Sequence, residues 1–373
     1  MSDTADRCSP LAYRIALAGM QGMGVDLARK LLDVVGSEER FFGMNEKELR
    51  ALTGGRSKIY RDDYRRECLQ RAVREEAFVT GHNISATYFA DEGYPHRLLE
   101  APDAPAMFYS LGRCNLESAH VVSVVGTRHA TQYGMAFCDR LIGELSQCVP
   151  DLVVVSGLAY GIDIAAHRAA LKHGVPTVAV LPRGLNRIYP AMHRSDAVAI
   201  VKQGGMLLTD YTSQDAVQKS NFLARNRIVA ALSDCTVVVE SAGSGGALVT
   251  ASLAMSYNRD VMAVPGRPGD EYSAGCNKLI ATNKAALITG AGDLLAAMRW
   301  ESAAGQPRQL DLFPRLTAEE QAVVDAIRDR GEVHLNTLAQ ALGQPVYKLM
   351  SVLVELDCKK VITTLPGCRY ALL

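Results

Sequence analysis

The chain has 373 residues, which is enough for two or three domains of ordinary size. Its 40 basic residues balance 40 acidic ones, so the protein is not coated in positive charge and any polyanion site must be local. The N-terminus lacks the apolar core of a signal peptide, and no apolar run approaches the roughly 18–20 residues that span a bilayer. We therefore expect a soluble, cytoplasmic protein without a membrane contact.

The nine cysteines are scattered along the chain, and none of them forms a CxxC pair or a Cys/His cluster with zinc spacing. Several lie inside apolar runs, where a reduced cysteine behaves as a small hydrophobe. We expect free thiols in a reducing cytosol, and neither a metal nor a cofactor.

Residues 1–84 are expected to form a small domain of short helices separated by glycines. The segment from Gly22 to Leu32 resembles a helix-hairpin-helix or SAM-like element, in which turn amides can hold a DNA phosphate. Glycines also end helices for purely structural reasons, and this second interpretation is favoured. The expected helices are Leu11–Leu17, Asp26–Val35, Asn45–Leu52 and Ile59–Glu75.

Residues 85–300 contain short runs that are apolar on both faces and alternate with helical stretches such as Tyr133–Gln147. This pattern indicates a parallel sheet covered on both sides, that is, a doubly wound, mostly parallel Rossmann-like α/β domain. A glycine follows nearly every run, and ligands of such sheets bind beyond the carboxyl ends of the strands. The expected strands are Val121–Val125, Leu152–Val155, Thr177–Leu181, Met206–Leu208, Thr236–Val239, Val261–Val264 and Leu287–Ile288.

Residues 301–315 lack periodicity and are interpreted as a linker. Beyond it, Thr317 and Glu320 have the spacing of a capping box that opens a helix. Two further helices, Thr337–Leu342 and Val346–Leu356, precede a terminal hairpin, so residues 316–373 are expected to form a winged-helix domain. The last of these helices carries only Lys348, which favours a partner-binding or dimer-supporting role over DNA reading.

The turns after the expected strands carry the candidate chemistry. The first strand ends in Gly126-Thr127-Arg128, where amides ahead of a helix can cradle an anion and Arg128 adds a forked cation. The turns at Ser156-Gly157, at 184–190 (which ends in Tyr189-Pro190) and at Gly243-Ser244-Gly245 should open on the same edge of the sheet. A row of small-residue turns suits an extended phosphate backbone as well as a single nucleotide.

The densest polar cluster lies between Lys219 and Arg227 and surrounds Phe222. Cations can neutralise phosphates there, and a ring can stack on a base for roughly 1–3 kcal/mol whatever the nucleotide sequence. A solvated helix start with a buried Phe222 is an equally good interpretation of the spacing alone. The other members of the cluster are Asn221, Arg225 and Asn226.

Over residues 85–295 the chain closely resembles the DNA-processing protein A (DprA/Smf) family. The matching motifs are Val125–Arg128, Ser156–Asp163, Lys219–Phe222, Arg225–Val229, Ser244–Leu248 and Val264–Gly266, with Tyr94-Pro95 and Leu98 at the entry to the domain.

The resemblance implies single-stranded DNA binding in a basic pocket, loading of the RecA recombinase during natural transformation, and a homodimer built on the Rossmann-like domain. Arg128, Lys219 and Phe222 would be the pocket residues, and Arg225 and Arg227 would shape or charge it. The expected nucleic-acid-binding residues are Gly126, Thr127, Arg128, Ser156, Gly157, Lys219, Asn221, Phe222, Arg225, Asn226, Arg227, Gly243, Ser244 and Gly245.

Enzymatic alternatives are weaker, and no catalytic residue is expected. Ser156, Asp163 and His167 could suggest a hydrolytic triad, but no G-x-S-x-G elbow frames the serine. A nucleotide-processing phosphoribohydrolase of the LOG type would need a carboxylate soon after the 242–250 loop, and Asp260 is the first acidic residue after it. A NAD-dependent dehydrogenase would need a G-x-G-x-x-G turn, which is missing. A purely structural scaffold that binds RecA is the third alternative.

Overall fold

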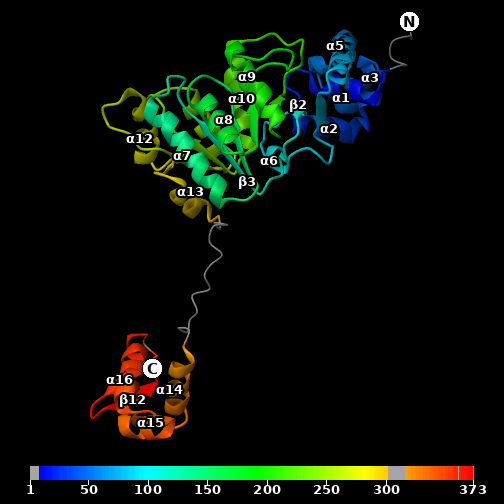
Figure 1. The fold of residues 1–373 in the computed structure, drawn as a ribbon. Helices are drawn as coiled ribbons and strands as arrows, with labels where there is room; N and C mark the ends of the chain where they lie inside the picture. The colour runs from blue at the N-terminus through cyan, green and yellow to red at the C-terminus, as the bar shows by residue number, and fades with distance from the viewer. Residues whose placement is uncertain (1–7, 301–315, 360, 373) are drawn as a thin grey trace. The chain divides into compact units, whose positions relative to one another are not determined.

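A computed structural model describes residues 8–300, 316–359 and 361–372 of the chain (Figure 1). The chain divides into two compact units, Met1–Ala304 and Gly305–Leu373. The predicted linker, 301–315, lies outside the described residues. The predicted boundary at residue 84 stays a prediction, because the N-terminal helices and the sheet belong to one compact unit. Within the described ranges, no helix is both long and apolar enough to cross a bilayer.

The N-terminal part of the first unit is helical. The Ser9 hydroxyl accepts a hydrogen bond from the Ala12 amide at 3.0 Å, and Asn45 and Glu48 form a capping box, so side chains satisfy first-turn amides. The four predicted helices are observed, together with α3, which was not predicted because it is only six residues long. The helices are α1 (Pro10–Ala18), α2 (Val25–Val35), α3 (Glu38–Gly43), α4 (Glu46–Thr53) and α5 (Asp62–Gly81).

A nine-stranded sheet forms the centre of the first unit, in the order β1-β2-β6-β5-β4-β3-β7-β8-β9. The seven strands β3 to β9 are mutually parallel. Strand β2 is antiparallel to both of its neighbours, β6 and the edge strand β1. The seven predicted strands and the mostly parallel sheet are confirmed, whereas the two antiparallel edge strands were not predicted. The strands are β1 (Ser85–Tyr88), β2 (Met107–Gly112), β3 (His120–Val125), β4 (Leu152–Ser156), β5 (Thr177–Val180), β6 (Met206–Thr209), β7 (Cys235–Val238), β8 (Asp260–Ala263) and β9 (Ala286–Leu287).

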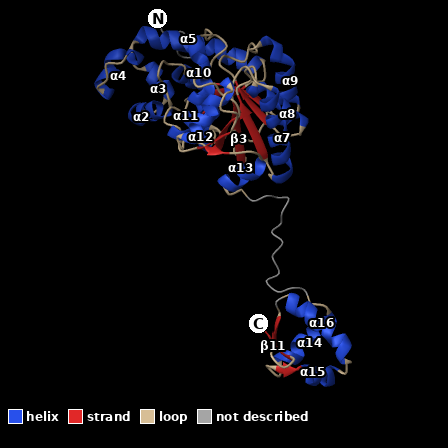
Figure 2. Ribbon diagram, turned by 90° about the vertical axis from the view of Figure 1, so that its left-hand side faces the viewer, coloured by secondary structure: helices blue, strands red, loops and turns tan. Residues whose placement is uncertain are grey.

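Helices cover both faces of this sheet (Figure 2). Val121 and Val125 of β3 pack into the same core as α10 and α11, whereas Val122 and Val124 pack with α7 and α8 on the other face. Every position of a central strand is therefore buried, which explains the continuous apolar runs. The helices are α6 (His96–Leu99), α7 (Gln132–Cys148), α8 (Ile162–Lys172), α9 (Arg194–Lys202), α10 (Lys219–Ala231), α11 (Gly246–Ser256), α12 (Ala274–Ala281) and α13 (Ala291–Met298).

The N-terminal helices contact the sheet domain beside the antiparallel edge (Figure 1). Arg71 of α5 pairs with Asp215 at 2.7 Å, and the buried carboxylate of Glu75 accepts the Ser213 amide at 2.9 Å. Asp215 and Ser213 both lie on the segment between β6 and α10. Helix α5 therefore braces the segment that leads into α10.

The second unit has its own small core, in which Ile327, Leu338 and Leu349 are fully buried. Thr317 and Glu320 form the predicted capping box, and the predicted terminal hairpin is observed up to Leu372. A two-residue strand, β10, completes a three-stranded antiparallel sheet. The elements are α14 (Ala318–Arg328), β10 (Val333–His334), α15 (Leu335–Leu342), α16 (Val346–Cys358), β11 (Ile362–Leu365) and β12 (Arg369–Leu372).

Candidate functional site

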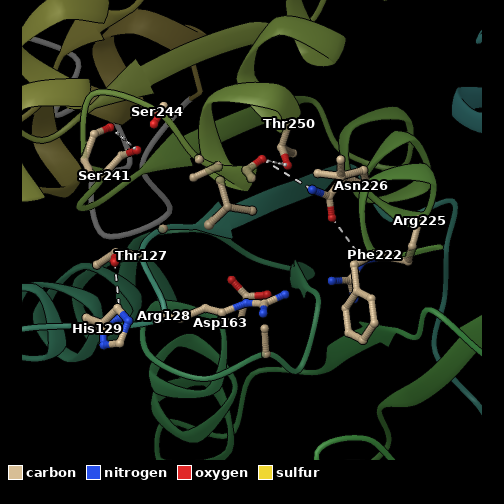
Figure 3. Close-up of a pocket in the computed structure, with 18 of the residues that line it drawn as sticks. Thr127, Arg128, His129, Asp163, Phe222, Arg225, Asn226, Ser241, Ser244 and Thr250 are labelled. Carbon is tan, nitrogen blue, oxygen red and sulfur yellow. Dashed lines mark hydrogen bonds between the residues drawn. The ribbon is translucent and has the colours of Figure 1, made fainter. Parts of the chain in front are cut away.

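A cavity of about 560 Å³ lies beyond the carboxyl ends of β3 and β7 (Figure 3). These two strands are neighbours, and the chain leaves β3 toward one edge of the sheet and β7 toward the other. Such a switch point leaves a crevice that helices do not cover, and it is where open α/β sheets bind ligands. The loop after β3, the loop after β7 and the start of α10 line the cavity.

Glu240 holds the loop after β3 in place. Its backbone carbonyl accepts the Thr127 amide at 2.7 Å, and its carboxylate accepts the Thr131 amide at 2.9 Å and the Thr131 hydroxyl at 2.5 Å. Gly126 lies so close to Ile162 and to the Glu240 carbonyl that a Cβ atom would overlap them. Glu240 is thus a polar group just beyond the end of β7, and it fixes the backbone that presents Arg128.

Arg128, Phe222 and Lys219 all line the cavity. The Arg128 guanidinium lies over the Phe222 ring, 5.4 Å from its centroid, and the Tyr189 ring meets the same ring edge-on at 5.3 Å. Lys219 is the exposed first residue of α10. Within the described residues neither Arg128 nor Lys219 has a carboxylate partner at ion-pair distance. We call these two cations the lip of the pocket; both are available to an anion.

Arg225 and Asp163 line the cavity from below and are almost completely buried. The Arg225 guanidinium donates to the Gly157 carbonyl at 2.6 Å and to the Val180 carbonyl. Burial lowers the pKa of Arg225 and raises the pKa of Asp163, and the opposite charge of each residue counteracts these shifts. We call Arg225 and Asp163 the floor of the pocket. The hydrogen bonds of Arg225 tie α10 to the ends of β4 and β5.

The cavity brings together most of the predicted site residues. Helix periodicity explains the set from α10, because Lys219, Phe222 and Asn226 are spaced three or four residues apart and share one face. Whether these residues contact a ligand stays a prediction. The predicted residues that line the cavity are Gly126, Thr127, Arg128, Lys219, Phe222, Arg225, Asn226, Ser244 and Gly245.

Five predicted residues do not line this cavity. The buried Ser156 hydroxyl donates to the Val124 carbonyl at 2.7 Å, and the Asn221 amide donates to the Ala216 carbonyl at 3.2 Å. Arg227 faces away from the pocket and pairs with Asp210 at 2.5 Å. Gly157 instead packs against the Arg225 guanidinium, where a Cβ atom would overlap it, and Gly243 is exposed outside the lining set.

Several lining residues were not predicted as site residues, among them His129, Asp163, Tyr189, Leu223 and Thr250. Asp163 was considered only as a catalytic partner. Leu223 and Thr250 lie next to predicted motifs. Tyr189 belongs to the turn after β5, which was expected at this sheet edge, but the residue itself was not predicted as part of the site.

The side chains of Ser156, Asp163 and His167 do not form a hydrogen-bonded triad in the described structure. The His167 Nδ1 atom lies 2.8 Å from the Thr177 hydroxyl, and burial lowers the pKa of His167 to about 3. The ring is therefore a neutral core group, because desolvation disfavours its charged form.

The geometry so far defines a class: a Rossmann-like domain with an unneutralised cationic pocket at its switch point. Comparison with known proteins places the chain more closely. The family model of DNA recombination-mediator protein A matches residues 85–299, and the chain belongs to this family of DNA-processing proteins.

Curated relatives agree with this placement. The chain is 33% identical over 295 residues to Protein Smf of Escherichia coli, covering 74% of each chain. It is 38% identical over 206 residues to DNA processing protein A of Streptococcus pneumoniae, covering 55% of this chain and 71% of the relative.

Solved structures show the same fold. The structure of DNA processing protein A from Streptococcus pneumoniae matches with a TM-score of 0.64 at 29% identity, covering 78% of this chain and 98% of the other. The structure of DNA processing protein A from Helicobacter pylori, which gives insight into its single-stranded DNA binding mode, matches with a TM-score of 0.52 at 29% identity. The match covers 58% of this chain and 95% of the other.

Proposed function

We propose that this protein binds single-stranded DNA in the cavity at the β3–β7 switch point and helps to load the RecA recombinase onto it, without catalysing a reaction. One observation carries the proposal: Arg128 and Lys219, two cations without carboxylate partners among the described residues, line the same cavity as the Phe222 ring, and Arg128 lies over that ring. Cations beside an aromatic ring suit a phosphate backbone with stacked bases and need no particular base sequence. The single-stranded DNA binding of the Helicobacter pylori relative supports it.

The family supports the remaining assignments. Recombination mediation by the family is the reason to expect RecA as a partner, during natural transformation in organisms that take up DNA. A homodimer through the Rossmann-like domain and a cytoplasmic location belong to the same proposal. We also assign residues 1–84 to a SAM-like helical domain and residues 316–373 to a winged-helix domain, since three helices with a terminal hairpin fit that fold.

An enzyme of the phosphoribohydrolase type has less support. Glu240 is the one carboxylate of the loop after β7, and it is only 5% exposed and is engaged with Thr131. The one carboxylate that lines the described cavity, Asp163, lies in its floor beside Arg225. Glycosidic cleavage requires a carboxylate free to act at the sugar.

The test is a titration with a labelled thymidine oligomer at several salt concentrations, beside a duplex of equal length and AMP. We expect salt-dependent binding of the single strand and a large loss of affinity in Arg128→Ala/Lys219→Ala. The matched control is Lys202→Ala/Lys284→Ala, which removes two exposed cations from the opposite, amino-terminal edge of the sheet.

Other outcomes assign the function elsewhere. Binding or cleavage of AMP without binding of the oligomer would replace the proposal with a nucleotide enzyme. RecA loading that survives in the Arg128→Ala/Lys219→Ala variant would indicate a scaffold that contacts RecA and does not use the pocket.

A further inference from the structure

The loop that follows β5, residues 181–190, continues the wall of the pocket. Its Tyr189 ring lies 5.3 Å from the Phe222 ring, centroid to centroid. Pro182, Tyr189 and Pro190 share a small adjoining cavity with Arg128 and Phe222. A DNA strand bound in the main pocket would therefore contact this loop next.

The backbone of this loop is held at both ends. Gly184 lies against the backbone of Thr212, where a Cβ atom would overlap it, and the Asn186 side chain donates to the Ser213 carbonyl at 2.8 Å. Beyond the loop, the His193 Nδ1 atom lies 2.8 Å from the Leu158 carbonyl. The side chains of the loop are therefore presented from a braced backbone.

Two arginines of this loop, Arg183 and Arg187, have no carboxylate at ion-pair distance in the described part of the chain. The Arg183 Nε atom is buried and has no hydrogen-bond partner there. Burial and the charge of Arg187 both lower the pKa of Arg183, so the two guanidiniums are near enough to repel each other. Other arginines of this unit are neutralised, as in the pairs Arg97–Asp234, Arg168–Asp196, Arg227–Asp210 and Arg259–Glu100.

An uncompensated pair of like charges is unfavourable, and a bound anion removes the repulsion. Arginine presents a planar fork of donors that matches phosphate oxygens. The pair therefore fits an anionic ligand group such as a phosphate.

The aromatic surface next to these cations also points to a nucleic acid. The Phe222 ring is half-buried, with Arg128 over its face and Tyr189 against it. Tyr189 is 40% exposed, and Tyr160, which lines the same small cavity, is 41% exposed. More ring surface is thus open to a base on these tyrosines than on Phe222.

We propose that Tyr189, Arg183 and Arg187 form a second nucleotide-binding station, continuous with the pocket, in which the ring stacks on a base and the guanidiniums hold phosphates of the same strand. This inference rests on the proposed function and extends the footprint of the strand from the switch point to the end of β5.

The first test uses Arg183→Gln/Arg187→Gln, with Lys202→Gln/Lys284→Gln as the control that removes the same charge from the opposite sheet edge. For a thymidine oligomer of about fifteen nucleotides, a length within the range of such sites, we expect weaker binding. The slope of log affinity against log salt should become shallower by about 1.4, since each phosphate on a single strand contributes about 0.7. An oligomer of about three nucleotides, held by the pocket alone, should bind to Arg183→Gln/Arg187→Gln with the same affinity as to the wild type.

The ring is tested separately. Tyr189→Leu should weaken binding of the long oligomer about fivefold or more, the lower end of a base–aromatic stack, and Tyr189→Phe should restore it. Ultraviolet crosslinking of an oligomer containing 5-iododeoxyuridine should label the tryptic peptide 188–194, in which Tyr189 is the aromatic residue that can stack. Phe222 lies on a different tryptic peptide, 220–225, so the two stations can be told apart.

Two failures are distinguishable. If the wild type binds the long oligomer, crosslinks only through 220–225 and loses nothing in the loop variants, the second station is wrong and the proposed function stands. If the wild type binds neither oligomer, the proposed function itself is wrong, and this inference with it.

Discussion

The lip and the floor of the pocket contain similar side chains with opposite roles. At the lip, Arg128 and Lys219 are exposed and have no carboxylate partner among the described residues. In the floor, Arg225 is 4% exposed and is engaged by the carbonyls of Gly157 and Val180. A cation is thus available to a ligand only where the fold leaves it without a partner, and a basic sequence motif does not by itself establish a contact.

The largest expected effect concerns the floor. Arg225→Ala removes the donor of the buried Gly157 and Val180 carbonyls, and each buried acceptor left unpaired costs about 1–3 kcal/mol in the free energy of unfolding. Urea unfolding followed by Trp300 fluorescence measures this, because the chain's one tryptophan packs on His120 beside β3. Arg128→Ala is the control and should change stability by no more than about 0.5 kcal/mol. Equal effects in the two variants would remove the distinction between lip and floor.

The next effect concerns pH. The pKa of His167 falls from its ordinary value of 6.5 to about 3 on burial, so between these pH values only the unfolded chain binds the proton. Stability is therefore complete above pH 6.5 and decreases below it, by at most about 1.4 kcal/mol per pH unit. Urea unfolding at several pH values should show a shallower decrease for His167→Gln. If the free energy of unfolding fell equally with pH in the wild type and in His167→Gln, the buried His167 ring would not be neutral.

A smaller effect separates two cations of α10. Lys219→Ala should reduce the salt slope of oligomer binding by about 0.7, one phosphate contact on a single strand. Arg227→Ala should leave that slope unchanged, because its guanidinium pairs with Asp210 at 2.5 Å and faces away from the cavity. Fluorescence anisotropy at a series of salt concentrations measures both. A reduced slope for Arg227→Ala would place this residue at the interface after all.

The smallest effect is expected from α16, in the second unit. Its exposed positions Tyr347, Met350 and Val354 are apolar and are spaced along one face, with Lys348 as the cation of the helix. Tyr347→Ser/Val354→Ser should therefore leave affinity for the oligomer within about twofold, since no phosphate contact is removed. A larger loss in the same anisotropy assay would add the second unit to the DNA interface.

Much of the fold could be predicted because burial leaves a mark on the sequence. Most positions of the seven parallel strands are apolar, and Thr317 with Glu320 marks the start of α14. The edge strand β1 was missed, since it is partly exposed and carries no continuous apolar run, and its neighbour β2 was missed as well. Helix α3 was missed because six residues are too few for a periodic pattern.

The candidate site was predictable in part for a related reason. Glycine turns after parallel strands converge at one sheet edge, so Gly126, Ser244 and the start of α10 could be grouped from the strand assignment. The turn after β5 could be placed at the same edge, but the contact of its Tyr189 with Phe222 could not be predicted, because it depends on how this loop folds back toward α10.

By itself the sequence determined the two-sided parallel sheet, the edge at which a ligand would bind and the residue types available there. The tertiary structure alone decided which cations stay free. Arg225 and Arg227 find their partners at Val180 and Asp210, which are distant in the sequence, whereas no such partner reaches Arg128 or Lys219 in the described structure. The physical reason is that neutralisation of a charge depends on contacts a few ångströms away, and only the folded chain creates those contacts.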